Sequence, residues 1–437
     1  IQTLPKGKKG INKNIFHFFK VLKQIKDFDS CATICKKFMC KYEEEISMLK
    51  SKDFESMNLS ECKDFLEYSY KLTKDLSYDR FKYALFPTML IFDKYTKLLQ
   101  KIDQSYTAFD LYKNLDNKTA TVNTDISDMA EKISKNIKLK EAILSGESYK
   151  NLYTKFDDFK TMADRFLLNN GFKSDYNCYC LEAKTFIEDP DRLINILKPI
   201  LLSASDQNKN SENFDDLMKR LEVVSGGKYK SIEADIQSFR YFHIVREESQ
   251  YLWESLFYYV RKCVLRANLL LLENEDYKSG IANLFFNELI EAMKRGYLNK
   301  KDLENIKNRN EKFPLSIKVW QASKLLIFDA KGDILKGVSG SFGKVVGRAC
   351  IIHSPKEFYK MQKGDILVCH LTDPEWTPLF KLASAVVADT GAALSHAAIV
   401  AREYGIPAVL GVGFATTKYK DGDMLQVDGD EGTVRGL

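Results

Sequence analysis

The sequence predicts a multidomain α + α/β fold, in which a large all-α domain is followed by a small β/α domain. From about residue 12 to residue 325, apolar residues recur at three- and four-residue spacing, which is the period of an amphipathic helix. Beyond about residue 331 the pattern changes to short apolar runs separated by Gly and Asp, which is typical of strands and turns. A chain of 437 residues is long enough for two or three such domains.

The helical domain is predicted from five periodic segments and one much longer pattern. The five segments are Ile15–Ile25, Cys40–Leu49, Cys62–Leu76, Thr88–Leu99 and Ile126–Leu144. The long pattern, from about Lys230 to Leu271, keeps one broad stripe apolar, so we expect a single spine helix of roughly 60 Å. Ser60 and Asp189-Pro190 mark helix starts. Ser203–Glu212 and Gly226-Gly227 are predicted to be loops.

The C-terminal part carries strand patterns with regular punctuation. Gly343–Ile352 and Met424–Leu437 are strand-like runs interrupted by Gly or Asp. Phe328–Gly337 contains two glycines and is the candidate hinge. We therefore divide the chain into a helical domain at residues 1–327, a linker at 328–337 and a β/α domain at 338–437.

The most informative stretch lies between Gly364 and Val412. Ile366–Cys369 and Ala385–Ala388 are short apolar runs fit for buried strands. A turn of small residues, Thr390 to Ala393, follows the second run. The next segment, Ser395 to Tyr404, is a good helix that stops at Gly405.

His396 falls in the first turn of that helix. The first N–H groups of a helix lack intrahelical acceptors, and the positive end of the helix dipole favours an anion there. A neutral imidazole at this place can attack phosphorus, and the same amides would hold the phosphoryl group it gains. The sequence therefore predicts that His396 is a nucleophile and that the helix N-terminus beside it binds the phosphoryl group. Ser395 beside it does not form a hydrolase dyad, because neighbours on a helix point about 100° apart.

Composition excludes several function classes. Hydrophobic residues make up 45% and charged residues 29% of the chain, as in ordinary soluble proteins. No run of eighteen apolar residues predicts a membrane span. The net charge of +6 is spread over helix faces where lysines alternate with acids, so no nucleic-acid surface is predicted.

The nine cysteines are predicted to be reduced thiols of a cytoplasmic protein. Cys31, Cys35 and Cys40 form one group, and Cys178 and Cys180 form another. Neither group has zinc-site spacing or a nearby His, so structural cysteine is the preferred interpretation and no metal is expected on this chain.

The stretch TGAALSHAAIVAREYGIPAVLGV closely resembles the phosphohistidine swivelling domain of the phosphoenolpyruvate-utilising enzymes, which include pyruvate phosphate dikinase, phosphoenolpyruvate synthase and rifampin phosphotransferase. The upstream TDPEWTPLF looks most like the rifampin phosphotransferase branch and its synthase-like relatives. Ala392 departs from the family, which usually has a second glycine there, and Phe342 stands where the family usually has proline.

The resemblance implies that His396 is the phosphocarrier. It implies that four residues near His396 bind the phosphate or support the structure of its site: Thr390, Gly391, Ser395 and Arg402. It implies a role in docking, or at the edge of the site, for Thr372, Asp373, Trp376 and Thr377.

The helical part resembles the same branch more weakly. Ile244–Leu272 is similar to its substrate-domain helix, where Arg246 and Glu247 stand as candidate substrate residues beside the alternative of an ordinary ion pair. Phe166–Ile194 is similar to a second family segment but departs from it in two ways. Phe172 and Lys173 replace His and Arg, and Asn177 and Tyr179 replace acidic residues. Lys173 remains a candidate substrate residue, although lysine cannot reproduce a bidentate guanidinium clamp.

By this resemblance the chain is an ATP-dependent, dikinase-type phosphotransferase component. ATP and Mg²⁺ would bind an ATP-grasp domain, in cis or in trans, because no nucleotide motif is found here. His396 would take the β-phosphoryl group, with AMP and phosphate released overall, and pass it to a small-molecule acceptor in the helical domain, with a hydroxyl preferred. The start, IQTLPKGKKG, suggests a piece of a longer polypeptide. Two alternatives stay open: pyruvate-to-phosphoenolpyruvate synthesis, and a non-catalytic binding or regulatory protein that keeps the carrier fold.

Overall fold

The computed structural model describes residues 28–103, 106–112, 115, 118–174, 181, 183–202, 214–272, 280–312, 334–372, 376–392 and 395–437. The predicted helix Ile15–Ile25 and the predicted loop Ser203–Glu212 lie outside these residues, as do residues 328–333 of the predicted 328–337 linker. The chain divides into two compact units, which are described separately. Unit 1 is Ile1–Lys52, Tyr68–Asn117 and Asn213–Trp253, and unit 2 is Asp53–Glu67, Lys118–Glu212 and Glu254–Leu437. The predicted division at residue 327 stays a prediction.

Unit 1 is built from helices. It contains α2 (Phe28–Lys50), most of α3 (Leu59–Arg80), the π-helical turn η1 (Phe81–Leu85), α4 (Phe86–Leu99), the 3-10 turn η2 (Ala108–Tyr112), α10 (Phe214–Ser225), the 3-10 turn η4 (Gly226–Lys228) and the first part of α11 (Tyr229–Leu272). The predicted spine helix is confirmed, since α11 begins and ends within one residue of the expected bounds. Aromatic rings fill the centre of the unit, where Tyr112 stacks on Phe239 at a centroid distance of 4.9 Å.

Unit 2 begins with a helical part. Its helices are α5 (Lys118–Lys135), α6 (Ile137–Leu144), α7 (Tyr149–Lys155), α8 (Asp157–Asn170), α9 (Asp191–Leu202), the 3-10 turn η6 (Ile281–Asn283) and α12 (Phe286–Arg295), and residues 300–312 are also helical. The single periodic segment Ile126–Leu144 forms two helices, because Asn136 interrupts it. The Asn136 side chain accepts a hydrogen bond from the Leu139 N–H and caps α6.

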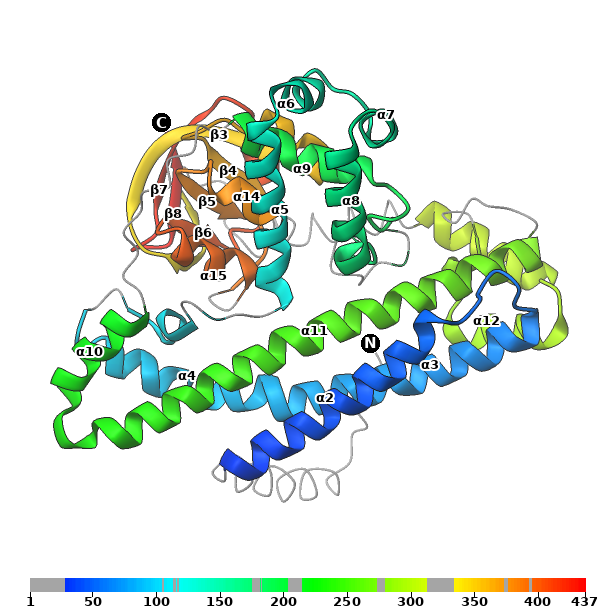
Figure 1. Cartoon of the computed structure of the whole chain (residues 1–437), viewed down its shortest axis with the longest axis horizontal. Coiled ribbons are helices and arrows are strands. Elements are labelled where there is room, and N and C mark those ends of the chain that lie inside the picture. The colour runs from blue at the N-terminus through cyan, green and yellow to red at the C-terminus, as the bar shows by residue number, and fades with distance from the viewer. Residues whose placement is uncertain are drawn as a thin grey trace. The chain divides into compact units, whose positions relative to one another are not determined.

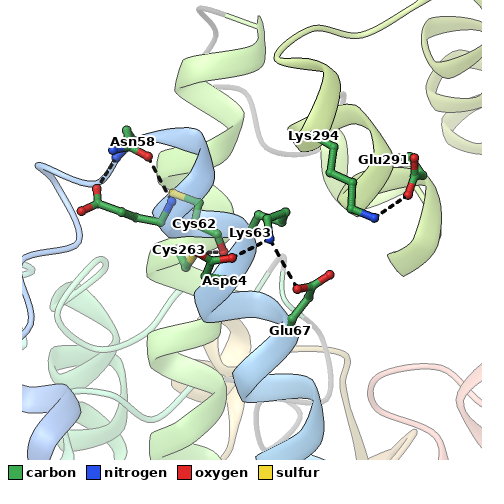
Figure 2. Close-up of polar contacts among 9 residues, drawn as sticks. Asn58, Cys62, Lys63, Asp64, Glu67, Cys263, Glu291 and Lys294 are labelled. Atoms are coloured by element: carbon green, nitrogen blue, oxygen red, sulfur yellow. Dashed lines mark hydrogen bonds and ion pairs between the residues drawn. The ribbon is translucent and has the colours of Figure 1, made fainter.

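The first turn of α3, which also lies in unit 2, starts one residue before the predicted Ser60. Asn58 and Glu61 accept hydrogen bonds from each other's backbone N–H groups at 3.0 and 2.8 Å, which is a reciprocal capping arrangement. The buried Cys263 thiol of α11 donates to the Cys62 carbonyl at 3.5 Å (Figure 2). These two cysteines are free thiols within a helix–helix contact, in keeping with the structural role expected for cysteine.

The rest of unit 2 is a small β/α domain on one curled sheet. Its strands are β1 (Ile334–Lys336), β2 (Val338–Ser341), β3 (Lys344–Ile352), β4 (Ile366–Cys369), β5 (Ala385–Ala388), β6 (Ala408–Leu410), β7 (Met424–Asp428) and β8 (Thr433–Gly436). The strand order is β1-β8-β7-β3-β4-β5-β6-β2. The β3–β4–β5–β6 pairs are parallel and the remaining pairs are antiparallel. Short helical turns connect them: η7 (Pro355–Lys360), α14 (Thr377–Phe380), α15 (His396–Glu403) and α16 (Ala415–Lys418).

Part of the predicted linker belongs to this sheet. Ile334–Lys336 forms β1 and pairs with β8, while β2 pairs with β6 at the other end of the strand order. Only Gly337 separates these two edge strands, so the sheet must curl until its edges meet. A Cβ at Gly337 would lie 2.4 Å from the Leu410 carbonyl oxygen, which explains why glycine stands at this crossing.

Both faces of the parallel strands are buried. One face joins a core with Val434, Leu425 and other residues enclosed by the curl. The other face, with Leu367, Val386 and their neighbours, shares a single core with the buried side chains of α5 to α9. Burial on both faces explains why these strands are continuous apolar runs rather than alternating ones. Figure 1 shows α5, α9 and α14 lying against this side of the sheet. None of the described helices is both long and apolar enough to cross a membrane.

Candidate functional site

The site begins at the carboxyl ends of β4 and β5. These strands are parallel neighbours, and Cys369 at the end of one pairs with Ala388 at the end of the other. The carboxyl ends of parallel strands meet at the same edge of a sheet, where open α/β sheets bind ligands. The segment after β4 carries Thr372 and Thr377, and the turn after β5 leads to His396.

The His396 ring contacts a threonine hydroxyl at each nitrogen. Thr372 Oγ1 lies 2.9 Å from Nδ1, and Thr377 Oγ1 lies 3.2 Å from Nε2. The Phe380 ring meets the imidazole edge-on, with centroids 6.1 Å apart and planes at 86°. The residue as a whole is half-buried, and the two threonines are 8% and 3% exposed. The imidazole is therefore oriented from three sides while part of the residue still meets solvent.

His396 lies in the first turn of α15, as the sequence predicts, and it is the first residue of this helix, which begins one residue after the expected Ser395. Ser395 is the N-cap with extended backbone angles, and its side chain does not cap the helix. The first hydrogen bond of helical spacing runs from the Ile399 N–H to the Ser395 carbonyl at 3.1 Å. The earlier N–H groups of such a helix lack intrahelical acceptors and carry the positive end of the dipole. The Ser395 hydroxyl is buried and has no hydrogen-bond partner among the described residues, so it is a further polar group at this end of the helix.

Thr390 and Gly391 shape the turn before the helix. The Thr390 backbone N–H and hydroxyl both donate to the His370 carbonyl, each at 2.9 Å, which joins the turn after β5 to the segment after β4. Gly391 has a φ of 130°, which side-chain-bearing residues rarely adopt, and a Cβ there would lie 3.1 Å from Ser395 Oγ. Both residues act here on the backbone path that delivers the imidazole. Their predicted contact with a phosphate stays a prediction.

The remaining predicted residues of this domain lie farther from the imidazole. Trp376 is buried in the core, 5.1 Å from the Phe358 ring centroid, and its predicted part in docking stays a prediction. Arg402 is six residues beyond His396, which places it roughly 240° around the helix from the imidazole at 3.6 residues per turn. Its predicted phosphate contact also stays a prediction. Asp373 lies outside the described residues.

In unit 1, Arg246 and Glu247 of α11 form an ion pair with a distance of 3.5 Å, and both side chains are mostly covered. They lie near a buried stack in which the Tyr112 and His243 rings are 3.7 Å apart at 13°. Burial lowers the pKa of His243 to about 4, and the nearby Glu247 opposes this shift. Sequence reasoning missed this stack because its two members are far apart in the chain and neither belongs to a recognisable motif.

Lys173 has a buried partner within unit 2. Its Nζ lies 2.6 Å from Glu254 Oε2, and the two side chains are 10% and 3% exposed. This geometry favours a structural ion pair for Lys173 over contact with a substrate. The other departures from the family segment, Asn177 and Tyr179, lie outside the described residues, as do Cys178 and Cys180.

Sequence reasoning also placed Thr372 and Thr377 at the edge of a site without foreseeing that they would contact the imidazole. The available signal was the adjacency of β4 and β5, which brings the segments after them together. Across the part of the chain that the structure describes, no three His, Cys, Asp or Glu side chains gather in a way that could hold a metal ion.

Comparison with known families agrees with this geometry. Residues 361–432 match the family model of the PEP-utilising enzyme mobile domain, and residues 81–247 match that of the rifampicin phosphotransferase fourth domain. The first match contains β4, β5, α15 and both threonines. The second contains Lys173, His243 and Arg246. The chain thus contains a segment similar to the mobile domain of PEP-utilising enzymes and a segment similar to the fourth domain of rifampicin phosphotransferase.

Curated relatives match over part of their length. The uncharacterized phosphotransferase YvkC of Bacillus subtilis is 51% identical over 98 residues, which cover 22% of this chain and 12% of that protein. The phosphoenolpyruvate synthase of Aeropyrum pernix is 51% identical over 106 residues, covering 24% and 13%. The rifampicin phosphotransferase of Bacillus subtilis is 31% identical over 237 residues, covering 50% and 27%. The matched segments therefore cover between 12% and 27% of the length of these three relatives.

Proposed function

We propose that this chain is the carrier and acceptor-binding portion of a dikinase-type phosphotransferase. His396 receives a phosphoryl group from ATP, held with Mg²⁺ on an ATP-grasp domain in cis or in trans, and passes it to a small molecule. The observation that carries the proposal is the His396 imidazole at the start of α15, held at both nitrogens by Thr372 and Thr377 inside the matched mobile domain.

The chemistry asked of His396 is a balanced displacement. A ring-nitrogen lone pair forms an N–P bond to the β-phosphorus while the P–O bond to AMP breaks, and the AMP oxygen keeps the electron pair; water takes up the γ-phosphoryl group, which leaves as phosphate. The N–H groups at the start of α15 are suited to the negative charge of the bound phosphoryl group. In the second step an acceptor hydroxyl oxygen forms a P–O bond and gives up its proton to solvent, while the N–P bond breaks and the ring nitrogen takes back the electron pair. An acceptor hydroxyl is our first choice because part of the chain matches a rifampicin phosphotransferase domain.

Phosphate labelling tests the carrier step. The chain is incubated with an ATP-grasp domain from a relative and with ATP labelled at the β-phosphoryl group. We expect one acid-labile, base-stable phosphoryl group, located at His396 by mass spectrometry, and none in the His396→Ala variant. His353, which lies after β3 with its backbone N–H bonded to Glu357, gives the matched control, because His353→Ala should label like the wild type. If His396 takes no label from ATP in the presence of a competent ATP-grasp domain, the carrier function is wrong, and the alternative of a binding protein that keeps the carrier fold is favoured.

For the acceptor step we propose that Arg246 and Glu247 help to bind the acceptor. They are mostly covered, oppositely charged and inside the match to the rifampicin phosphotransferase fourth domain. Rifampicin is the first probe, because relatives carry that activity in their names. Arg246→Gln should weaken rifampicin binding measured by calorimetry, whereas Lys219→Gln, an exposed residue of α10, should not. Equal binding by both variants would remove Arg246 from the acceptor site.

A further inference from the structure

The starting observation is that the two contacts on the His396 imidazole are unequal. Thr372 Oγ1 is 2.9 Å from Nδ1, whereas Thr377 Oγ1 is 3.2 Å from Nε2. A covalent N–P bond is far shorter than either distance. A phosphorus atom on one nitrogen would therefore occupy the space between that nitrogen and its threonine, so one of the two contacts must give way on phosphorylation. The longer contact, at Nε2, is the weaker one.

Thr377 is held where it is by its surroundings. It begins α14, and Pro378 follows it, while Leu379 and Phe380 are 0% and 1% exposed in the core. The backbone that carries Thr377 therefore has little freedom to retreat from the imidazole. Its β-branched side chain is stiff at χ1, but the hydroxyl hydrogen can turn to a new acceptor. His396 is half-buried whereas Thr377 is 3% exposed, so we take the imidazole to be the group that moves.

Resting on the proposed function, we propose that Thr377 is a positioning residue that covers Nε2 until the phosphoryl group arrives. In the unphosphorylated protein the Thr377 O–H donates to the Nε2 lone pair, while Nδ1–H donates to Thr372 Oγ1. This arrangement fixes the Nδ1–H tautomer and leaves Nε2 as the nucleophile. When the imidazole swings away from Thr377, the Nε2 lone pair forms the N–P bond as the bond from phosphorus to the donor breaks, and the donor's leaving atom keeps that electron pair. Nδ1 keeps its proton, and the Thr377 O–H donates to a phosphoryl oxygen instead.

Covering Nε2 has two opposite kinetic consequences. A hydrogen bond to the lone pair stabilises the unreacted imidazole, so it slows attack on phosphorus. A hydrogen bond from the same hydroxyl to a charged phosphoryl oxygen is stronger than one to a neutral nitrogen, so it protects phosphohistidine from hydrolysis. Removing the hydroxyl should therefore raise the rate of phosphorylation and shorten the life of the product. A residue that only fills space would change neither rate in this paired way.

The first test reads the tautomer of His396 in the full chain without any phosphorylation. Two-bond ¹H–¹⁵N NMR spectra, assigned with His396→Gln, should show the Nδ1–H form in the wild type. Thr377→Val keeps the shape of the side chain and removes the hydroxyl. Because Thr372 Oγ1 still accepts from Nδ1–H, this variant should keep the Nδ1–H form, and its Nε2 ¹⁵N resonance should move downfield because the lone pair has lost its hydrogen bond. Thr377→Ser keeps the hydroxyl and should restore the wild-type Nε2 resonance. A wild-type imidazole already in the Nε2–H form would overturn the inference.

The second test uses phosphoramidate, a small phosphoryl donor that needs no ATP-grasp domain. The Nε2–P bond forms as the P–N bond of phosphoramidate breaks, and ammonia leaves with the electron pair and a proton. Thr377→Val should label about fivefold faster, as expected for loss of an ordinary hydrogen bond. Its phosphohistidine should hydrolyse about thirtyfold faster, as expected for loss of a charge-assisted hydrogen bond about twice as strong. Thr372→Val is the comparison, because it should slow labelling and give a mixture of linkages in ³¹P spectra.

The outcomes separate this inference from the proposed function. If Thr377→Val labels and hydrolyses like the wild type, or if Thr377→Ser behaves like Thr377→Val, the inference is wrong while the carrier function stands. If wild-type His396 takes no phosphoryl group from phosphoramidate or from ATP with its partner, the carrier function fails. The tautomer experiment then still decides whether Thr377 covers Nε2.

Discussion

Replacing Lys173 tests whether this residue is structural or touches a substrate. Lys173 Nζ lies 2.6 Å from Glu254 Oε2, with side chains 10% and 3% exposed. At an effective dielectric constant of about 20, unit charges at this separation attract by about 6 kcal/mol before the cost of removing them from water. Removing one member of a buried pair costs about 3–5 kcal/mol, whereas replacing both members with apolar residues is often neutral. Lys173→Met and Glu254→Met should therefore each destabilise unit 2 by about 3–5 kcal/mol, and the double variant should not.

Urea unfolding followed by circular dichroism measures these free energies, and the double-mutant cycle gives the coupling between the two side chains. The matched control is Lys219→Met, because Lys219 and Asp216 form an ion pair with side chains 75% and 51% exposed and its loss should leave the unfolding midpoint unchanged. The reasoning fails if the effects of the two single variants simply add. It also fails if Lys173→Met keeps full stability and loses acceptor binding, since Lys173 would then act on a substrate.

Three further predictions concern other buried groups. Burial lowers the pKa of His243 from 6.5 to about 4, so the unfolded chain binds a proton that the folded chain does not. Stability should fall by about 3 kcal/mol as the pH drops through that window, and His243→Phe should abolish this slope in pH-dependent urea unfolding. Burial raises the pKa of the Cys350 thiol to about 12, so iodoacetamide at pH 8 should modify the exposed Cys40 and leave Cys350 unmodified. Mass spectrometry of the labelled peptides measures this difference. Rapid labelling of Cys350 would contradict its burial. Gly391→Ala places a Cβ at a residue with a φ of 130°, 3.1 Å from Ser395 Oγ. It should therefore lower the free energy of unfolding by about 1–3 kcal/mol, measured by thermal unfolding. An unchanged unfolding midpoint would show that the turn adapts.

Local pattern was enough to predict the elements that carry the site. Ile366–Cys369 and Ala385–Ala388 were recognisable because each is a short apolar run bounded by turn residues, and both are strands with these bounds. The start of α15, which lies one residue after the predicted Ser395, followed from the small-residue turn before it. The spine helix α11 was predictable because its apolar stripe continues over about twelve turns at 3.6 residues per turn. In each case the information lies within the element itself.

Features that depend on distant parts of the chain were not predictable in this way. β1 is three residues long and exists because β8, about a hundred residues later, offers it an edge. The buried pair Lys173–Glu254 joins residues that are 81 positions apart. The contacts of Thr372 and Thr377 with His396 arise from tertiary placement of two segments, although the parallel pairing of β4 and β5 could have suggested that these segments meet.

The position of Thr377 links the chemistry of the imidazole to the helices of unit 2. α14 carries Thr377 and packs against α9, and the Lys381 Nζ that follows α14 donates to Ser127 Oγ of α5 at 3.0 Å. The group that contacts Nε2 is therefore held by the same core that joins α5 to α9 to the sheet. Any motion that carried the sheet away from these helices would have to open this core and would also release α14. Moving the sheet together with α5 to α9 as one body would leave this core intact and would therefore cost less free energy. In such a motion Thr377 would stay in contact with Nε2 until a phosphoryl donor displaced Thr377.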